Sequence, residues 1–387
     1  MPLMIFSKEQ PIYLDYAATT PVSARVAAAM APYFSEKFGN PSSLHKKGQE
    51  AQAALDEARA TVAELLGVSW KEVFFTASAT ESLNTVLRGS AVSARQRGIA
   101  TPHIITTNIE HSAVLETCRE LEKYGVEVTY LPVNSEGLVS AKQVRDVLKE
   151  TTVLVSVMLV NNEIGTIQPI AEIAEVLKGT NTLLHTDAVQ AVNYLDIRPT
   201  TLGVDIMTLS GHKMYGPKGV GLLYKKESVA IAPLLTGGGQ ERGLRGGTEN
   251  VPAIVGFAEA LKETTELREA ETARVRALRD SFFAGVEHSA GISINGSREQ
   301  RVANNINVSL EGVSADMALP WLDARGIYAS SGSACRAHVP EPSHVIAALG
   351  KEDHATSSIR VTLGRSTTKR DIERAVDAVV ELRNKHS

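Results

Sequence analysis

Short runs of apolar and β-branched residues alternate with longer helix-like stretches through the middle of the chain, and this alternation constrains the fold most strongly. Strands that alternate with helices form a parallel sheet covered by helices. Residues 152–160 are almost continuously apolar, as expected of a strand buried on both faces. The pattern predicts a large α/β domain. Its expected strands are residues 73–76, 103–107, 126–132, 152–160, 182–186, 206–209 and 220–224, the last as an edge or antiparallel strand.

Helices are expected between these strands. The first should begin near Ser43 and end at Gly67, because glycine often terminates a helix. Further helices are predicted at residues 81–89 and 112–124. The first helix would have one largely apolar face, formed by Ala51, Ala54, Leu55, Ala58, Val62 and Leu65.

The pattern changes after about Pro252, which predicts a second and smaller domain. Residues 254–289 are rich in Ala, Glu and Arg, and are expected to form a long linking helix. Two short strands and a closing helix should follow. A chain of 387 residues exceeds the roughly 150 of one typical domain, which agrees with this division. The large domain is expected at residues 16–255, and the smaller α+β domain after it would contain strands at 305–310 and 359–362 and a helix at 369–385.

The overall charge and the cysteines exclude several classes of protein. A net charge of −4, with both signs spread along the chain, argues against a nucleic-acid-binding protein, which would have a basic face. The longest apolar stretch is far shorter than the roughly 20 residues that span a bilayer. Residues 1–10 do not resemble a targeting segment. Two distant cysteines, Cys118 and Cys335, do not form a disulfide framework, so the protein is expected to be soluble and cytoplasmic.

Lys213 and Asp187 are the first candidates for a catalytic site. Lys213 lies just after the 206–209 strand among Ser, His and Gly residues, where it could form a Schiff base with an aldehyde cofactor. Considered alone, it is better explained as a solvated lysine in a glycine turn. Asp187 ends the preceding strand; it could cap a helix, or pair with the ring nitrogen of pyridoxal phosphate (PLP). The two residues together favour PLP.

A phosphate site and an aromatic partner for the cofactor are also predicted. Residues 75–81 pass from strand to helix through small and hydroxyl residues, so the amides near Ala79 and the Thr80 hydroxyl would suit a phosphate. No Walker motif or Gly-x-Gly-x-x-Gly motif follows a strand, which disfavours nucleoside triphosphates and NAD. His111 could stack on the cofactor ring and exchange protons, although an isolated histidine is usually structural or solvated.

Cys335 lies in a run of small residues that predicts an exposed loop, with Arg336 and His338 beside it. These neighbours would lower the pKa of the thiol and make it reactive. An incidental surface thiol and a Cys-x-x-His metal pair are the alternatives, and the metal pair lacks a second pair of ligands. No metal site is therefore expected. Cys118 falls within a predicted helix, as a buried and inert thiol.

Two arginine-containing segments remain open to more than one interpretation. Residues 237–248 are dense in glycine and contain Arg242 and Arg245, which could bind an anion or a neighbouring subunit, or lie in a plain flexible loop. Arg360 lies within a predicted strand. Its planar guanidinium would suit a substrate carboxylate, and a structural ion pair is equally compatible with the spacing.

Several of these segments resemble the NifS/IscS-like cysteine desulfurases, a group of class-V aminotransferase-fold enzymes. The similarity extends from residues 13–21 almost to the C-terminus, with its segments in the same order. It is carried most specifically by Glu110-His111, Asn161-Asn162-Glu163-Ile164-Gly165, Ser210-Gly211-His212-Lys213 and Ser330-Ser331-Gly332-Ser333-Ala334-Cys335.

The resemblance implies an α/β, PLP-dependent transferase fold of the aspartate aminotransferase type. It has a large domain with a mostly parallel sheet, and a smaller domain (1–15 and 256–387) that carries the Cys335 loop. It also implies a homodimer with shared active sites. By the family pattern Lys213 would hold PLP, Asp187 its ring nitrogen and Gln190 its ring hydroxyl, while His111 would stack on the ring. The phosphate would be bound by Ala79, Thr80, Ser210 and His212 with Thr248 of the partner subunit, and the substrate carboxylate by Asn162 and Arg360.

The implied reaction converts L-cysteine to L-alanine. Lys213 would move the Cα proton, and the Cys335 thiolate would attack the substrate sulfur to give a persulfide for a sulfur-acceptor protein. The chain ends at Ser387, without the longer tail with which some members dock an iron–sulfur scaffold, so tRNA thiolation or another route stays open beside iron–sulfur assembly. Selenocysteine lyase and another aminotransferase-fold enzyme are the nearest alternatives, although transamination needs no protein thiol. A catalytically silent scaffold protein is the alternative from another class.

Overall fold

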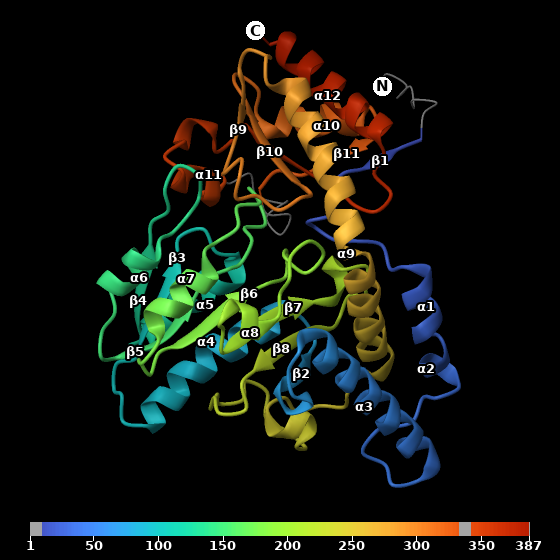
Figure 1. Cartoon of the computed structure of the whole chain (residues 1–387), viewed down its shortest axis with the longest axis vertical. Helices are drawn as coiled ribbons and strands as arrows, with labels where there is room; N and C mark the ends of the chain where they lie inside the picture. Colours follow the sequence, from blue (N-terminus) through green and yellow to red (C-terminus); the bar gives the residue numbers. More distant parts are fainter. Residues whose placement is uncertain (1–9, 333–341, 387) are drawn as a thin grey trace.

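A seven-stranded sheet forms the centre of the larger part of the molecule (Figure 1). The computed structural model describes residues 10–332 and 342–386. Across the sheet the strands run in the order β2 (Val73–Thr76), β8 (Gly221–Lys225), β7 (Ile206–Ser210), β6 (Leu183–Asp187), β5 (Thr152–Ser156), β3 (His103–Thr107) and β4 (Glu127–Leu131).

The sheet is mostly parallel, as the alternating pattern predicts. Strands β7, β6, β5, β3 and β4 are parallel, and β8 is antiparallel to both of its neighbours, β2 and β7. Strand β8 thus confirms the antiparallel alternative and is not an edge strand. The prediction that β5 continues to Val160 is wrong, because the strand ends at Ser156. The N–H groups of Val157 and Leu159 still donate to carbonyl oxygens of β6, whereas the N–H of Met158 donates to the Glu110 carboxylate, 3.0 Å away.

Helices cover both faces of this sheet. Successive residues of a strand point to opposite faces, so Ile104 packs with the cluster formed by α4 (Ala79–Gln96) and α5 (Ser112–Lys123). Ile105 packs in the larger cluster on the other face. The helices of that cluster include α3 (Lys46–Leu66) and α7 (Ile170–Leu177).

Helices α3 and α4 have boundaries that differ from the sequence prediction. Helix α3 ends as predicted, with Gly67 in the left-handed conformation at φ 67°, but it begins at Lys46 with His45 as its N-cap. Helix α4 does not stop at Gly89. A Cβ at that position would overlap the side chain of Ile231, so this glycine is required by packing inside a helix that continues to Gln96.

A long helix, α9 (Val251–Val286), connects the two parts of the molecule and extends upward through Figure 1. Its 36 residues pack against α1 (Ala24–Met30) and α3 at one end and against α12 (Lys369–Asn384) at the other. The buried apolar cluster on this side of the large sheet is continuous with the core of the smaller part.

The smaller part is built around an antiparallel sheet with the order β12 (Ser358–Thr362), β10 (Asn305–Leu310) and β9 (Ile292–Ile294). The N-terminal strand β1 (Ile12–Tyr13) pairs in parallel with β11 (Ile327–Tyr328), so the start of the described chain lies in this part. The remaining helices are α2 (Pro32–Ser35), α6 (Ala141–Asp146), α8 (Pro199–Leu202), α10 (Ala315–Asp323) and α11 (His344–Ala348), with 3₁₀ turns at Trp70–Glu72, Gly211–Lys213, Gln240–Gly243 and Glu352–His354.

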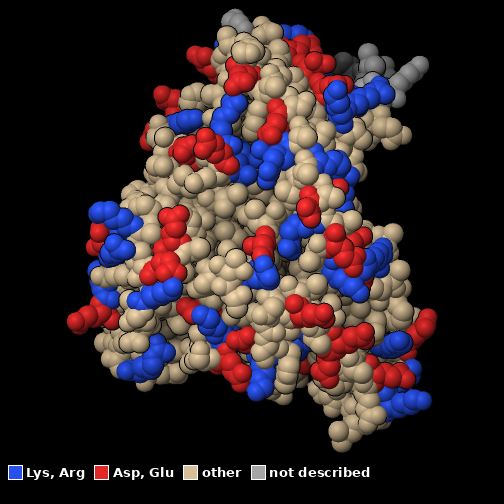
Figure 2. Space-filling view, in the orientation of Figure 1, with Lys and Arg blue, Asp and Glu red and all other residues tan. Residues whose placement is uncertain are grey.

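The surface and the helices agree with the sequence composition. On the face drawn in Figure 2, acidic and basic side chains are interspersed rather than gathered into one large patch. Among the described residues, no helix combines the length and the apolar character that crossing a membrane requires.

Candidate active site

A cleft of about 410 Å³ lies where β6 and β7 end and α4 begins. Ligand pockets commonly enclose about 300–1,000 Å³, and ligands of open α/β sheets bind outside the carboxyl ends of the strands. Residues far apart in the sequence meet in this cleft. Of the predicted site residues, it is lined by Ala79, Thr80, His111, Asn162, Asp187, Gln190, Ser210, His212, Lys213 and Arg360.

Lys213 is held in the cleft by the N-terminal segment. It ends the 3₁₀ turn Gly211–Lys213 after β7, and its Nζ donates to the carbonyl oxygens of Ala17 (2.6 Å) and Ala18 (2.7 Å). A Cβ on Gly211 would lie 2.9 Å from the carbonyl oxygen of Pro217, which explains why this tight turn begins with glycine. The amine is therefore positioned by main-chain acceptors, which no sequence pattern predicted.

Asp187 is the last residue of β6 and only 8% exposed. Burial raises the pKa of its carboxyl to about 6, although the N–H of Val189 (3.0 Å from Oδ1) and the charge of Lys213 act in the opposite direction. A buried carboxylate with a raised pKa is stabilised in its charged form by a nearby cation. This site therefore suits a group that brings a positive charge.

His185 supports Asp187 from the same strand. Burial lowers the pKa of its imidazole to about 3, so the ring is neutral. Its nitrogens lie 2.9 Å from the Ser156 hydroxyl on β5 and 3.1 Å from the Thr208 hydroxyl on β7. The ring thus links three neighbouring strands, β5, β6 and β7.

The start of α4 forms a site for an anion. Ser78 caps the helix by accepting from the N–H of Glu81, three positions on, which leaves the amides of the first turn at Ala79 and Thr80 beside the cleft. The positive end of the helix dipole favours a phosphate there. Lys218 also lines the cleft and was not among the predicted site residues, although it lies in the same 210–219 segment as Lys213.

His212 contributes a neutral ring to the same end of the cleft. Burial, with the charges of Lys213 and Lys218, lowers the pKa of its imidazole to about 4. Its Nδ1 lies 3.2 Å from the Thr19 hydroxyl. This ring can donate a hydrogen bond to an anion without adding a charge.

His111 is the N-cap of α5. Its Nδ1 accepts from the N–H of Ala113 at 3.1 Å, so the proton of the neutral imidazole lies on Nε2. The adjacent Glu110 is buried, and burial raises the pKa of its carboxyl to about 8. Its Oε1 accepts from the Thr107 hydroxyl (2.8 Å) and from the N–H of Met158.

Arg360 forms a structural ion pair and also lines the cleft. It is 1% exposed; its Nη2 donates to Asp15 Oδ1 and its Nη1 to the carbonyl oxygen of Asn162, both at 2.9 Å. Within the described ranges its buried Nε has no hydrogen-bond partner. The two interpretations of Arg360 are thus compatible, because one edge of the guanidinium is fixed while a donor remains for a ligand.

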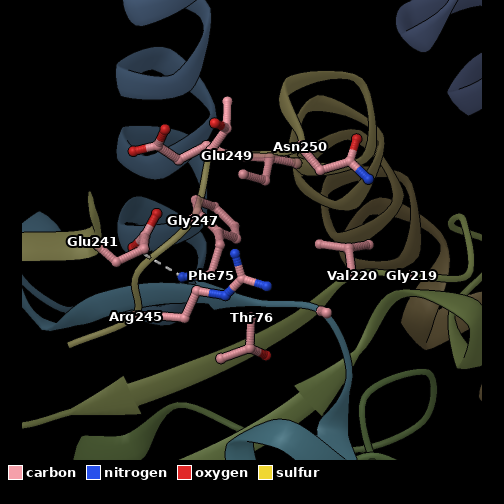
Figure 3. Close-up of a pocket in the computed structure, with 12 residues that line it drawn as sticks. Phe75, Thr76, Gly219, Val220, Glu241, Arg245, Gly247, Glu249 and Asn250 are labelled. Atoms are coloured by element: carbon pink, nitrogen blue, oxygen red, sulfur yellow. Dashed lines mark hydrogen bonds between the residues drawn. The ribbon is translucent and has the colours of Figure 1, made fainter. Parts of the chain in front are cut away.

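Thr248 lies in a neighbouring pocket of about 130 Å³, together with other parts of the 237–250 segment (Figure 3). That pocket shares Ala77, Gly219 and Val220 with the cleft. The segment is anchored by Glu241, which accepts from the N–H of Phe75 (3.0 Å). Thr248 is therefore not among the residues that line the cleft of its own chain.

The structure tests the prediction for only one of the two cysteines. Cys118 is fully buried in α5, and burial raises the pKa of its thiol to about 12, as expected of an inert thiol. Cys335 lies outside the described residues, in the segment 333–341. Across residues 10–332 and 342–386, no three His, Cys, Asp or Glu side chains are grouped so that they could hold a metal ion.

The family model of the class-V aminotransferases matches residues 12–375. This chain belongs to that family. The chain is 44% identical to the cysteine desulfurase IscS of Methanosarcina thermophila, over 98% of this chain and 93% of the relative. A solved structure described as a NifS-like protein is 38% identical, with a TM-score of 0.90 over 97% of this chain and 100% of the other. Another, SspA in complex with cysteine, is 38% identical with a TM-score of 0.80, and covers 91% of this chain and 98% of that one.

These comparisons confirm the predicted family, the PLP-dependent transferase fold and the cofactor class. The cleft of this chain suits PLP on its own chemistry. Asp187 is a buried carboxylate that a protonated ring nitrogen would stabilise, and Lys213 is an amine fixed beside it. The first turn of α4 and Lys218 line the same cleft and would suit the phosphate.

Proposed function

We propose that this chain is a PLP-dependent cysteine desulfurase, which converts L-cysteine to L-alanine and receives the sulfur on Cys335 as a persulfide. The observation that carries the proposal is the gathering of Lys213, Asp187, His111 and Arg360 in one cleft. The chain containing them is 44% identical to a cysteine desulfurase. A relative of 38% identity whose structure is described as a complex with cysteine supports L-cysteine as the substrate.

The cofactor would be held at three points. Lys213 would hold it covalently, Asp187 would pair with its ring nitrogen, and Gln190 would contact its ring hydroxyl. His111 would stack on the ring. When bound, PLP supplies an electron sink that stabilises negative charge on the substrate Cα. The phosphate would be bound by Ala79, Thr80, Ser210 and His212 with Thr248 of the partner subunit, and we add Lys218 because it lines the cleft.

The substrate is oriented by its carboxylate. Arg360 is already fixed by Asp15 and the carbonyl oxygen of Asn162, so little side-chain entropy is lost when its remaining donors bind the carboxylate. Asn162 completes this carboxylate site. Lys213 would remove the Cα proton, and His111 would exchange protons with the substrate.

Sulfur transfer then requires the Cys335 thiolate. It attacks the substrate sulfur: the S–S bond forms, the Cβ–S bond breaks, and the electron pair of that bond passes to the carbon skeleton. Cβ gains a proton and Cα regains one, which gives L-alanine. The substrate carbon is reduced while the two sulfurs are oxidised to a persulfide, so the transfer needs no external oxidant.

The organisation of the enzyme follows from the same family pattern. We propose a large domain at residues 16–255, a smaller domain at 1–15 and 256–387, and a cytoplasmic homodimer. Apolar side chains near α2 support an interface between subunits: Phe34 is 65%, Phe38 67% and Leu44 92% exposed. The IscS name of the relatives supports an iron–sulfur scaffold protein as the sulfur acceptor.

The test is the release of sulfide and alanine from L-cysteine with a thiol reductant present. We expect equimolar products from the wild type, loss of both with Cys335→Ala, and normal turnover with Cys118→Ala as the matched control. A PLP-loaded wild type that releases neither product, or full turnover by Cys335→Ala, would refute the proposal.

A further inference from the structure

Glu163 lies in a turn of the large part whose main chain is fixed from within. The carboxamide oxygen of Asn161 accepts from the N–H of Glu163 (2.9 Å) and of Ile164 (3.0 Å). The amide of the same side chain donates to the carbonyl oxygen of Ile109 at 2.8 Å. The turn therefore has one conformation, and it is tied to the segment that precedes His111.

Strand β10 of the smaller part fixes the same residue from the other side. The side-chain amides of Asn305 and Asn307 donate to the carbonyl oxygen of Glu163, at 3.0 Å and 3.2 Å. All three side chains are buried. The main chain of Glu163 is thus held at the junction of the two parts of the molecule, and the side chain starts from a fixed position.

The carboxylate binds one flank of a segment and lies close to the other flank. Ser343 donates its hydroxyl proton to Glu163 Oε2 at 2.6 Å, while the same hydroxyl oxygen caps α11. Gly332 lies against the same oxygen: a Cβ built on this glycine would be 3.3 Å from it. Gly332 and Ser343 are the described residues that flank the segment containing Cys335, with only residue 342 between Ser343 and that segment.

The same frame includes the residues proposed to bind the substrate carboxylate. Ser330 exchanges two main-chain hydrogen bonds with Arg360, of 3.1 Å and 2.6 Å. Arg360 in turn donates to the carbonyl oxygen of Asn162, the residue before Glu163. The substrate site and the two flanks are therefore connected through directly bonded neighbours.

We propose that Glu163 is a positioning residue for sulfur transfer. Its carboxylate binds Ser343 and lies beside Gly332, and so holds the flanks of the segment that contains Cys335 in a fixed relation to Asn162 and Arg360. This inference rests on the proposed desulfurase function, and it assigns Glu163 no contact with the cofactor. Loss of the anchor slows the step that needs Cys335 and leaves cofactor binding unchanged.

Glu163→Ala removes the anchor. Because a small misplacement of a reacting group can cost up to about a hundredfold in rate, we expect kcat to fall at least about tenfold. PLP content, the absorption spectrum of the bound cofactor and the KM for L-cysteine should stay at the wild-type values. Glu163→Gln should recover most of the rate, because its amide oxygen still accepts from Ser343. Glu172→Ala, an exposed carboxylate on α7, is the control.

Ser343→Ala tests the same contact without changing the turn at Glu163. It should lower kcat about as much as Glu163→Ala, and the double variant should be no slower than the slower single variant, because both changes remove one interaction. Since Ser343 also caps α11, Ser140→Ala, which removes the N-cap of α6, is the matched control for loss of a cap. Additive losses, or an unchanged kcat in Ser343→Ala, would overturn the inference.

A second measurement does not depend on turnover. The rate at which iodoacetamide alkylates Cys335 should differ about tenfold between the wild type and Glu163→Ala. The rate in Glu172→Ala should equal that of the wild type. The buried Cys118 is the unreactive internal reference. Equal alkylation rates in both variants, or a loss of PLP in step with the loss of kcat, would contradict the role of Glu163. A wild type without turnover would instead refute the desulfurase function, and the alkylation rates would still decide the role of Glu163.

Discussion

Replacing Asp187 by asparagine should stabilise the cofactor-free protein at neutral pH. The buried carboxyl has its pKa raised from 3.8 to about 6, which is a shift of about two units. One unit corresponds to 1.36 kcal/mol, so keeping this group charged in the folded chain costs about 3 kcal/mol. The asparagine side chain keeps an oxygen for the N–H of Val189 and has no charge to bury.

The pH dependence has a definite sign. Because the folded pKa is raised, the contribution of Asp187 is most favourable below the unfolded pKa near 3.8, and it is lost as pH rises through about 6. The advantage of Asp187→Asn should therefore be below about 1 kcal/mol at pH 4 and reach about 3 kcal/mol at pH 8.

Urea unfolding of cofactor-free wild type and Asp187→Asn at both pH values measures this difference. Asp196→Asn is the control, because Arg198 lowers the pKa of that carboxyl and its loss should not stabilise the protein. With the cofactor bound, the wild type should be the better protein of the two. Turnover of Asp187→Asn should be greatly reduced, because the ring nitrogen loses its partner. If Asp187→Asn is no more stable than the wild type at pH 8, Asp187 is not a desolvated carboxylate whose charged form needs a cation.

Two further predictions concern the catalytic lysine and the packing of α4. Lys213→Ala should lower turnover by at least about 10²–10⁴-fold, because the group that moves the Cα proton is lost, while circular dichroism stays unchanged; substantial turnover would exclude Lys213 as the base. Gly89→Ala should destabilise the protein by about 1–3 kcal/mol, because the new methyl group would overlap Ile231, whereas Val92→Ala on the exposed face of the same helix should change the free energy of unfolding little. Equal denaturation midpoints for these two variants would show that α4 does not pack on Ile231.

Local patterns in the sequence were sufficient to predict most of the large sheet. Its strands are buried on both faces, so they consist of short apolar runs that stand out from the helices between them. The positions of Asp187 and Lys213 after two such strands predicted a common site, because parallel strands end at one edge of the sheet. The cleft confirms that they meet there.

Features that depend on distant contacts could not be predicted in this way. Glycine at position 89 suggested a helix end, and only its packing against Ile231 shows why it lies inside α4. The apolar run after Ser156 suggested a longer strand. In the structure the carboxylate of Glu110 accepts from the N–H of Met158, a contact between residues that are distant in the sequence.

The sequence by itself determined the class of fold and the types of side chain available for chemistry, because strand periodicity and residue type are local properties. Tertiary structure decided which of these side chains meet. Arg360 is fixed by Asp15, which lies 345 residues away along the chain, and Lys213 by the carbonyl oxygens of Ala17 and Ala18. Such contacts leave no periodic pattern in the sequence, since their spacing is set by how the two parts of the molecule pack together.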